Sequence, residues 1–181
     1  MESSLHHTIY QLEKKHWWYA GRRRIIFDMI NRLLPPQARR ALDIGCGSGL
    51  NASLLPSKIK ETIGIEISDE AIKAAAYTNP RLTIIKGMWP DVSVPGIFDL
   101  IICLDVLEHI KDDEMALKTI ESLLAPGGIA ILTVPAFPFL WSDHDVAAHH
   151  IRRYTKPRLR MLLQTYTRLR ILRLSYFNFF L

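Results

Sequence analysis

The sequence lacks the features of secreted and membrane-spanning chains. It has only two cysteines among 181 residues, Cys46 and Cys103, and their apolar or glycine-rich surroundings suit a reducing compartment better than a disulfide framework. No stretch reaches the ~20 apolar residues that a membrane-spanning helix needs, and the first residues lack the basic start and apolar run of a secretory signal. We therefore expect a cytoplasmic protein without a membrane span.

The sequence also lacks long blocks of like charge, although its formal net charge is +5. The arginines form short separate groups, such as Arg22–Arg24 and Arg152–Arg153, which are most simply interpreted as solvated helix faces. No known nucleic-acid-binding module accompanies them, so we expect no nucleic-acid partner. An anionic small molecule remains compatible with the positive balance.

Short strand-like apolar runs alternate with helix-like stretches, and there are no internal repeats. This alternation predicts an α/β fold with a doubly wound, mostly parallel sheet. With 49% hydrophobic and 23% charged residues, the chain is long enough for one buried core, so residues 1–181 are expected to form a single domain. The expected strands are Ala41–Ile44, Thr62–Ile67, Leu82–Ile85, Phe98–Leu104, Ile129–Val134 and a sixth near Leu169–Tyr176.

Helices are expected between these strands and ahead of the first one. Their expected N-caps are Ser68, Asp112 and Thr155. Before the first strand, a helical stretch over residues 5–12 is followed by apolar residues at helical spacing from Ile25 to Leu33, which end at Pro35. We thus expect a helical cap or lid over residues 1–38, a cofactor-binding core over 39–134 and a substrate-side segment with the last helix and strand over 135–181.

A glycine-rich turn follows the first expected strand, in the segment Leu42–Gly49. Gly45, Gly47 and Gly49 would let a ligand approach the backbone at the carboxyl end of the sheet, where open α/β sheets bind ligands. A dinucleotide fingerprint would place a further glycine where this sequence has Leu50. The spacing therefore departs from the pattern that binds a pyrophosphate.

Two carboxylates beside this turn narrow the choice of ligand. Asp43 stands at the mouth of the turn, where it would repel a pyrophosphate but favour the ammonium and sulfonium cations of S-adenosylmethionine. Glu66 ends the second strand, where a carboxylate can accept hydrogen bonds from both ribose hydroxyls. An adenosine cofactor with a cationic tail fits both positions.

Four motifs resemble the class I, Rossmann-like S-adenosylmethionine-dependent methyltransferases, and more narrowly the small-molecule branch that includes the ubiquinone-biosynthesis O-methyltransferases. The motifs are LDIGCGSG at 42–49, GIEIS at 64–68, FDLIICLDVLEHI at 98–110 and LLAPGGIAILTVP at 123–135. They stand in the order and spacing of that family, and the resemblance covers about residues 13 to 178. It implies a three-layer methyltransferase fold with S-adenosylmethionine as cofactor.

The resemblance also implies roles for individual residues. Those expected to contact the methionine and ribose portion are Gly45, Cys46, Gly47, Ser48 and Gly49. Glu66 is expected to bind the ribose, Ile67 the adenine face, and Leu104 and Asp105 the methionine end. Where the family often has an acidic residue that binds the adenine amino group, this sequence has Met88 and then Trp89, which are expected only to pack on the ring.

Each carboxylate has a structural alternative. Asp43 is also explained as a turn residue, Glu66 as a solvated strand end, and Asp105 as the cap of a following helix. His109, in the third motif, is either a hydrogen-bonded structural histidine or an acid-base group.

Residues 135–154 are too long for a simple turn and should form a wall of the substrate pocket. Methyl transfer to a hydroxyl needs a base, and the candidates are His144, His149 and, with them, His109, Asp145 and His150. Further substrate-side candidates are Trp141, Arg152, Arg153 and Tyr154, of which the two arginines would grip an anionic group. The cluster of acidic residues and histidines at 143–150 lacks a recognised ligand spacing, so no metal is expected.

Two further features lie toward the ends of the sequence. Trp18 and Tyr19 either pack the cap against the domain or belong to a lid over the pocket. The family's sheet normally ends in a strand hairpin, whereas here one strand would follow the last helix, so that either the chain is truncated or a partner, such as a second copy, covers that edge.

The sequence therefore predicts an S-adenosylmethionine-dependent methyltransferase that acts on an oxygen or nitrogen nucleophile of a small molecule. The alternatives are a nicotinamide-dependent oxidoreductase, a cofactor-binding protein without catalysis and a nucleic-acid-binding factor.

Overall fold

The computed structural model describes residues 17–177, so the expected helical stretch at 5–12 lies outside the described residues. Five strands form one sheet in the order β3-β2-β1-β4-β5, and every neighbouring pair is parallel. The strands are β1 (Arg40–Ile44), β2 (Glu61–Glu66), β3 (Thr83–Lys86), β4 (Phe98–Leu104) and β5 (Leu124–Thr133). The strand order reverses between β1 and β4, which is the switch point where such sheets bind ligands.

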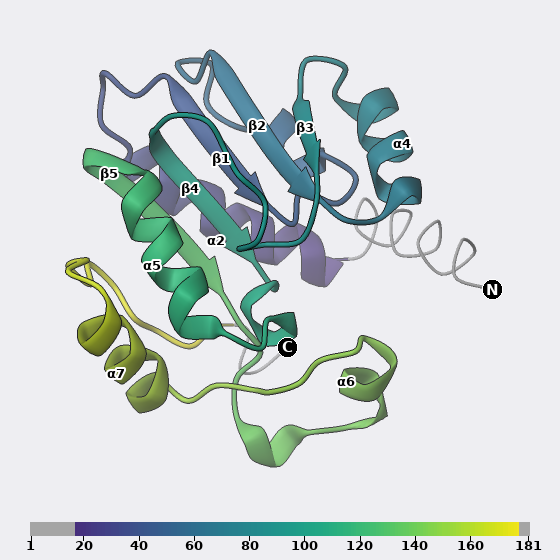
Figure 1. Ribbon diagram of the computed structural model, residues 1–181, viewed down its shortest axis with the longest axis vertical. Helices are drawn as coiled ribbons and strands as arrows, with labels where there is room; N and C mark the ends of the chain where they lie inside the picture. Colours follow the sequence, from purple (N-terminus) through teal and green to yellow (C-terminus); the bar gives the residue numbers. More distant parts are fainter. Residues whose placement is uncertain (1–16, 178–181) are drawn as a thin grey trace.

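Helices cover both faces of this sheet, as Figure 1 shows, with α5 in front of it and α2 behind it. The helices are α2 (Trp17–Leu33), α3 (Leu50–Ser53), α4 (Asp69–Thr78), α5 (Asp113–Leu123), α6 (Asp143–Ala147) and α7 (Lys156–Tyr166). Two short 3₁₀ helices, η1 (Leu107–His109) and η2 (Pro138–Leu140), follow β4 and β5. The predicted doubly wound α/β fold is confirmed.

The strand sequences are uninterrupted apolar runs because their side chains point alternately to the two faces of the sheet, and both faces are covered. In β4, Leu100 and Ile102 pack in one cluster with α2, whereas Ile101 and Cys103 belong to the other cluster, which includes α5 and α7 residues. All four side chains are at most 1% exposed. The sheet core is therefore buried on both faces.

The three expected N-caps are confirmed. Ser68 Oγ accepts a hydrogen bond from the Ala71 N–H at 3.3 Å, and Asp112 Oδ1 accepts from the Met115 N–H at 2.8 Å. Thr155 Oγ1 accepts from the Arg158 N–H at 3.3 Å. Each cap satisfies an N–H group that the first helical turn leaves unpaired.

The sixth strand is a wrong prediction, because residues 167–177 form no strand. The main-chain N–H groups of Arg168 and Leu169 donate instead to the side chains of Glu121 and Thr167, at 2.9 Å and 3.3 Å. Within residues 17–177, β5 pairs only with β4 and is an edge of the sheet. The fifth strand also begins at Leu124, earlier than predicted.

Helix α2 belongs to the core of the domain. Ile26 and Ile30, which are 3% and 0% exposed, lie one helical turn apart and pack against residues of β1, β4 and β5. The cap that the sequence predicts thus forms one of the helical layers over residues 17–33. None of the helices described between residues 17 and 177 is long and apolar enough to cross a membrane.

We expect Ile30→Ala to lower the free energy of unfolding by about 2–5 kcal/mol, because it leaves a cavity between α2 and the sheet. Leu33→Ala on the same helix is the control, since that side chain is 39% exposed and its loss should cost under about 1 kcal/mol. Urea denaturation of both variants measures the difference. Equally small effects would contradict the placement of α2 in the core.

Candidate functional site

The glycine turn after β1 depends on backbone conformations that favour glycine. Gly45, Gly47 and Gly49 have φ values of 69°, 52° and 71°. A Cβ on Gly45 would lie 2.4 Å from Val106 Cγ2, whereas a Cβ on Gly47 would meet nothing within 4 Å. The backbone at Gly47 therefore faces open space, as a ligand that contacts main-chain atoms requires.

The carboxylate of Glu66 joins this turn to the end of β2. Its Oε2 accepts a hydrogen bond from the Gly47 N–H at 2.9 Å, and its Oε1 accepts from the N–H groups of Ile67 and Ser68 at 2.8 Å and 2.9 Å. The side chain is half-buried, and a carboxylate has four lone-pair sites, so it can still accept from a ligand. Glu66 is fixed in place and is not a freely solvated strand end.

The floor of the turn is buried and acidic. Asp43 is 1% exposed, and Cys46 and Ser48 are 4% and 8% exposed. Burial raises the pKa of the Cys46 thiol, and the negative charges of Asp43 and Glu66 raise it further. The thiol is therefore protonated, and the turn carries negative charge only from its carboxylates.

Beyond Glu66, two apolar side chains are uncovered: Ile67 at the end of β2 is 55% exposed, and Met88 after β3 is 58% exposed. Trp89 is 3% exposed and packs in the core cluster with Ile65 and Phe98. The expectation that Trp89 packs on the adenine ring is thus corrected, because its indole fills the core. Of Met88 and Trp89, only Met88 has an exposed side chain that can cover a ligand.

Asp105, just beyond the end of β4, is bound by α2. Its Oδ2 forms an ion pair with Arg22, and its Oδ1 accepts a hydrogen bond from Thr133 Oγ1 at 2.8 Å. The N-cap of η1 is Val106, which excludes the alternative of Asp105 as a helix cap. Leu104, the last residue of β4, is half-buried beside it.

Sequence reasoning missed Arg22, which it grouped with solvated arginines. The Arg22 side chain is 11% exposed, and its guanidinium carbon lies 5.6 Å from the Trp18 ring centroid. Trp18, Arg22, Ile26 and Ile30 recur at helical spacing, and this stripe was the available signal. Trp18 also meets Tyr19 edge-on, with ring centroids 4.9 Å apart, and the ion pair of its neighbour Arg22 with Asp105 joins α2 to the chain just beyond β4.

The segment after β5 is held by the buried carboxylate of Asp145, which is 0% exposed. Arg153 donates to both of its oxygens at 2.7 Å and 2.9 Å, His150 Nδ1 lies 2.9 Å from Oδ1, and the Ser142 N–H donates to Oδ2 at 2.9 Å. The hydrogen bonds from Arg153 hold the pKa of Asp145 well below its usual range. Asp145 is therefore an ionised anchor.

A second buried carboxylate, Asp113, anchors the end of the same segment. Arg152 Nη1 lies 2.6 Å from Asp113 Oδ2, and the Tyr154 hydroxyl donates to the same oxygen at 3.0 Å. Tyr154 is 1% exposed. The assignment of Arg152, Arg153 and Tyr154 to substrate contact is thus corrected, because all three polar groups bind carboxylates within the protein.

The candidate bases occupy different environments. His144, on α6, His149 and His109 are exposed, and the His109 and His150 rings lie 4.8 Å apart. The partial burial of its ring lowers the pKa of His109, and the neighbouring His150 lowers it further. Trp141, 43% exposed, lies just before α6.

Glu108, which sequence reasoning did not single out, adjoins these histidines. Its side chain is 0% exposed, and neither carboxyl oxygen has a hydrogen-bond partner among the described residues. Burial raises the pKa of Glu108 to about 8, and the negative charge of Asp105 contributes to the rise. The only signal in the sequence was its position beside His109.

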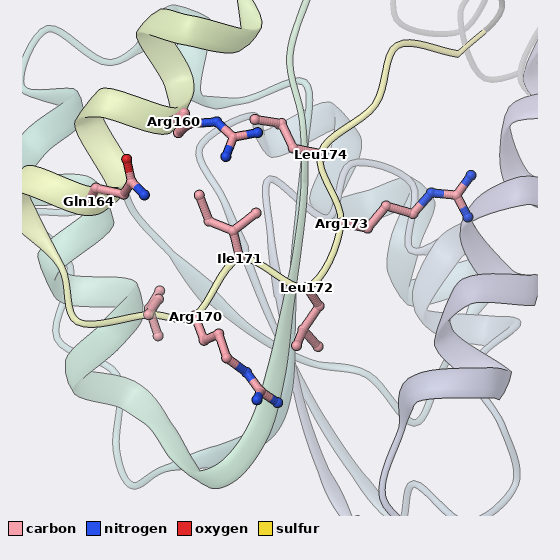
Figure 2. A pocket seen from close by; sticks show the side chains of 8 residues that line it. Arg160, Gln164, Arg170, Ile171, Leu172, Arg173 and Leu174 are labelled. Carbon is pink, nitrogen blue, oxygen red and sulfur yellow. The ribbon is translucent and has the colours of Figure 1, made fainter.

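A cavity of about 410 Å³ lies elsewhere, between α7 and the chain that follows it (Figure 2). Its lining includes Arg160, Arg170 and Arg173, together with Gln164 and the run 169–174. None of the predicted site residues lines it.

The sequence profile of the methyltransferase domain family matches residues 17–173, and the chain belongs to this family. It is 28% identical over 108 residues to a ubiquinone biosynthesis O-methyltransferase of Albidiferax ferrireducens, covering 56% of this chain and 43% of the relative. A protein of the same description from Xanthomonas euvesicatoria is 30% identical over 137 residues, 70% of this chain and 56% of the relative. The chain thus spans about half the length of these curated relatives.

Solved structures confirm the fold. The N-methyltransferase NodS of Bradyrhizobium japonicum, in complex with S-adenosyl-L-homocysteine, has a TM-score of 0.66 at 20% identity, covering 86% of this chain and 78% of NodS. DesVI of Streptomyces venezuelae has a TM-score of 0.63 at 21% identity, covering 75% of this chain and 58% of DesVI. At these identities the likeness concerns the fold alone.

We expect Tyr154→Phe to lower the free energy of unfolding by about 1.5–3 kcal/mol, since it removes a buried hydrogen bond to a charged group. Tyr77→Phe is the matched control, because Tyr77 is 89% exposed and its replacement should change stability by less than about 0.5 kcal/mol. Urea denaturation measures both values. A Tyr154→Phe variant with the same free energy of unfolding as the wild type would contradict the anchoring role.

Proposed function

We propose that the protein transfers the methyl group of S-adenosylmethionine to an oxygen or nitrogen nucleophile of a small molecule. The observation that carries this proposal is the open backbone at Gly47 beside the fixed carboxylate of Glu66. Membership of the methyltransferase domain family supports it.

The residues around the turn fit this cofactor. Glu66 can accept a hydrogen bond from a ribose hydroxyl, and the exposed side chains of Ile67 and Met88 offer apolar surface to an adenine ring. The carboxylate of Asp43 favours the cationic methionine end and disfavours the pyrophosphate of a nicotinamide dinucleotide, whereas the charge of Asp105 is balanced by Arg22. When bound, S-adenosylmethionine supplies a methyl group already activated on a sulfonium.

The protein must then align the acceptor and, for a hydroxyl, accept its proton. His144 and His149, exposed on the segment over residues 135–154, and His109 remain the predicted bases. The relatives are named O-methyltransferases and NodS an N-methyltransferase, which supports oxygen or nitrogen as the acceptor atom. Since Arg152 and Arg153 bind internal carboxylates, they give no support to an anionic acceptor.

A cytoplasmic location and a homodimer stay predictions. The edge strand β5 is the surface on which a second copy would pair, by adding strands to the sheet.

Ligand-dependent melting tests the cofactor. S-adenosylmethionine or S-adenosylhomocysteine at one hundred times its Kd should stabilise the protein by about 2.7 kcal/mol, and NAD should not. Stabilisation by NAD alone would overturn the proposal in favour of an oxidoreductase. If the cofactor binds, incubation with isotope-labelled S-adenosylmethionine and a metabolite extract, followed by mass spectrometry, tests transfer, and the absence of any labelled product would leave a cofactor-binding protein without catalysis.

We expect Glu66→Gln to weaken S-adenosylhomocysteine binding by about tenfold or more, because hydrogen bonds to a charged group contribute about 1.5–3 kcal/mol. Glu61→Gln is the control: Glu61 starts the same strand, is exposed and pairs with Arg40. Isothermal titration calorimetry measures both Kd values. Equal affinities of the two variants would contradict the assignment of Glu66 to ligand binding.

A further inference from the structure

We propose that Glu108, His109 and His150 form a binding site for one divalent transition-metal ion. Each residue offers a ligand atom, and the three atoms lie within 4.8 Å of one another. Glu108 and His109 come from η1, whereas His150 comes from the segment that follows α6. This geometry is independent of methyl transfer.

The hydrogen bonds of His150 leave one ring nitrogen ready to coordinate. Its Nδ1 lies 2.9 Å from Oδ1 of Asp145, which the pairing with Arg153 keeps ionised, so Nδ1 carries the proton and donates it. In the neutral ring, Nε2 then has a free lone pair, and this atom lies 3.9 Å from Glu108 Oε1. A carboxylate behind the imidazole is the usual partner of a metal-binding histidine.

His109 is oriented in the same way. Its Nδ1 lies 3.3 Å from the main-chain oxygen of His149, and a carbonyl oxygen can only accept, so Nδ1 is again the donor. His149 has a φ of 57°, an uncommon conformation for a residue with a side chain. Such strain concentrates at functional sites, and here it accompanies the carbonyl that sets the tautomer of His109.

Glu108 offers a carboxyl oxygen to the ion, and coordination would displace the proton that the buried group otherwise keeps. The side chain is 0% exposed, and neither oxygen has a hydrogen-bond partner within residues 17–177. A buried carboxylate is costly unless it is paired or coordinates a metal. A cation between Glu108 and the two imidazoles would compensate that cost.

The two segments that carry the ligands are tied together. The Ile151 N–H donates to the main-chain oxygen of Glu108 at 3.0 Å, next to both His150 and His109. Zinc bonds to nitrogen and oxygen are about 2.0–2.2 Å, so the side chains must draw inward around an ion. His109 is exposed, which leaves a route for the ion from solvent.

The donor set indicates which ions fit. Two imidazoles and one carboxylate suit Zn²⁺, Co²⁺, Ni²⁺, Mn²⁺ or Fe²⁺, whereas Mg²⁺ and Ca²⁺ prefer oxygen ligands alone. The expectation of no metal was based on the spacing within residues 143–150 alone. In the structure, His150 leaves that cluster to join Glu108 and His109, and Asp145 orients it from behind.

Metal binding is tested on the full chain without an affinity tag, stripped with a chelator. Equilibrium dialysis against Zn²⁺ or Co²⁺, followed by elemental analysis, should give one ion per chain, and a large excess of Mg²⁺ should not displace it. Glu108→Gln and His109→Ala should each weaken binding by at least tenfold, and Asp145→Asn by about ten- to one-hundredfold. His144→Ala is the matched control and should bind normally, because this exposed histidine is not one of the three ligands.

The proposal is overturned if the wild-type chain binds no ion at micromolar concentration, if Glu108→Gln and His109→Ala bind as tightly as the wild type, or if His144→Ala weakens binding equally. Melting curves of the metal-free variants identify those that are folded; His109→Ala, at an exposed position, should be among them. Binding of S-adenosylhomocysteine to the metal-free wild type is measured separately, so failure of the metal site is distinguished from failure of the proposed function.

Discussion

The parallel pairing of β1 with β2 on one side and β4 on the other is the constraint on which the glycine turn and its carboxylates depend. Because the three strands run in the same direction, Gly45, Glu66 and Asp105 all emerge at one edge of the sheet. Close packing secures this arrangement, since a Cβ on Gly64 would lie 2.6 Å from Cys46 Sγ. The turn can pack this closely against β2 only because residue 64, in β2, is a glycine.

The segment over residues 135–154 depends on a different interaction, the burial of Asp113 and Asp145. Each carboxylate receives one arginine of the pair Arg152–Arg153, so the positive charge of that pair is neutralised inside the protein. A buried carboxylate without its arginine would be strongly unfavourable, which makes these ion pairs determinants of the path of the chain. These two arginines are therefore matched by carboxylates within the protein and are not available to an anionic partner.

Local patterns in the sequence predicted most of the fold, because buried parallel strands are continuous apolar runs and N-caps act within one helical turn. The start of β5 was missed since Pro126–Gly128 has the composition of a turn. Arg22, Glu108 and Trp89 could not be assigned, because their environments come from contacts distant in sequence, such as the ion pair between Arg22 and Asp105. The glycine turn was predictable since its φ values require glycine locally.

The 3₁₀ helix η1 connects the two parts of the candidate site. It begins just after Asp105, on the cofactor side, and its main-chain oxygens at Leu107 and Glu108 accept hydrogen bonds from the Tyr154 hydroxyl and the Ile151 N–H. The segment over residues 135–154 is thus docked onto the chain that leaves β4. The same short helix also carries the buried carboxyl of Glu108 and lies directly after Asp105 and Val106. The contacts that hold the segment over residues 135–154 and the surroundings of Asp105 therefore share a single turn of backbone.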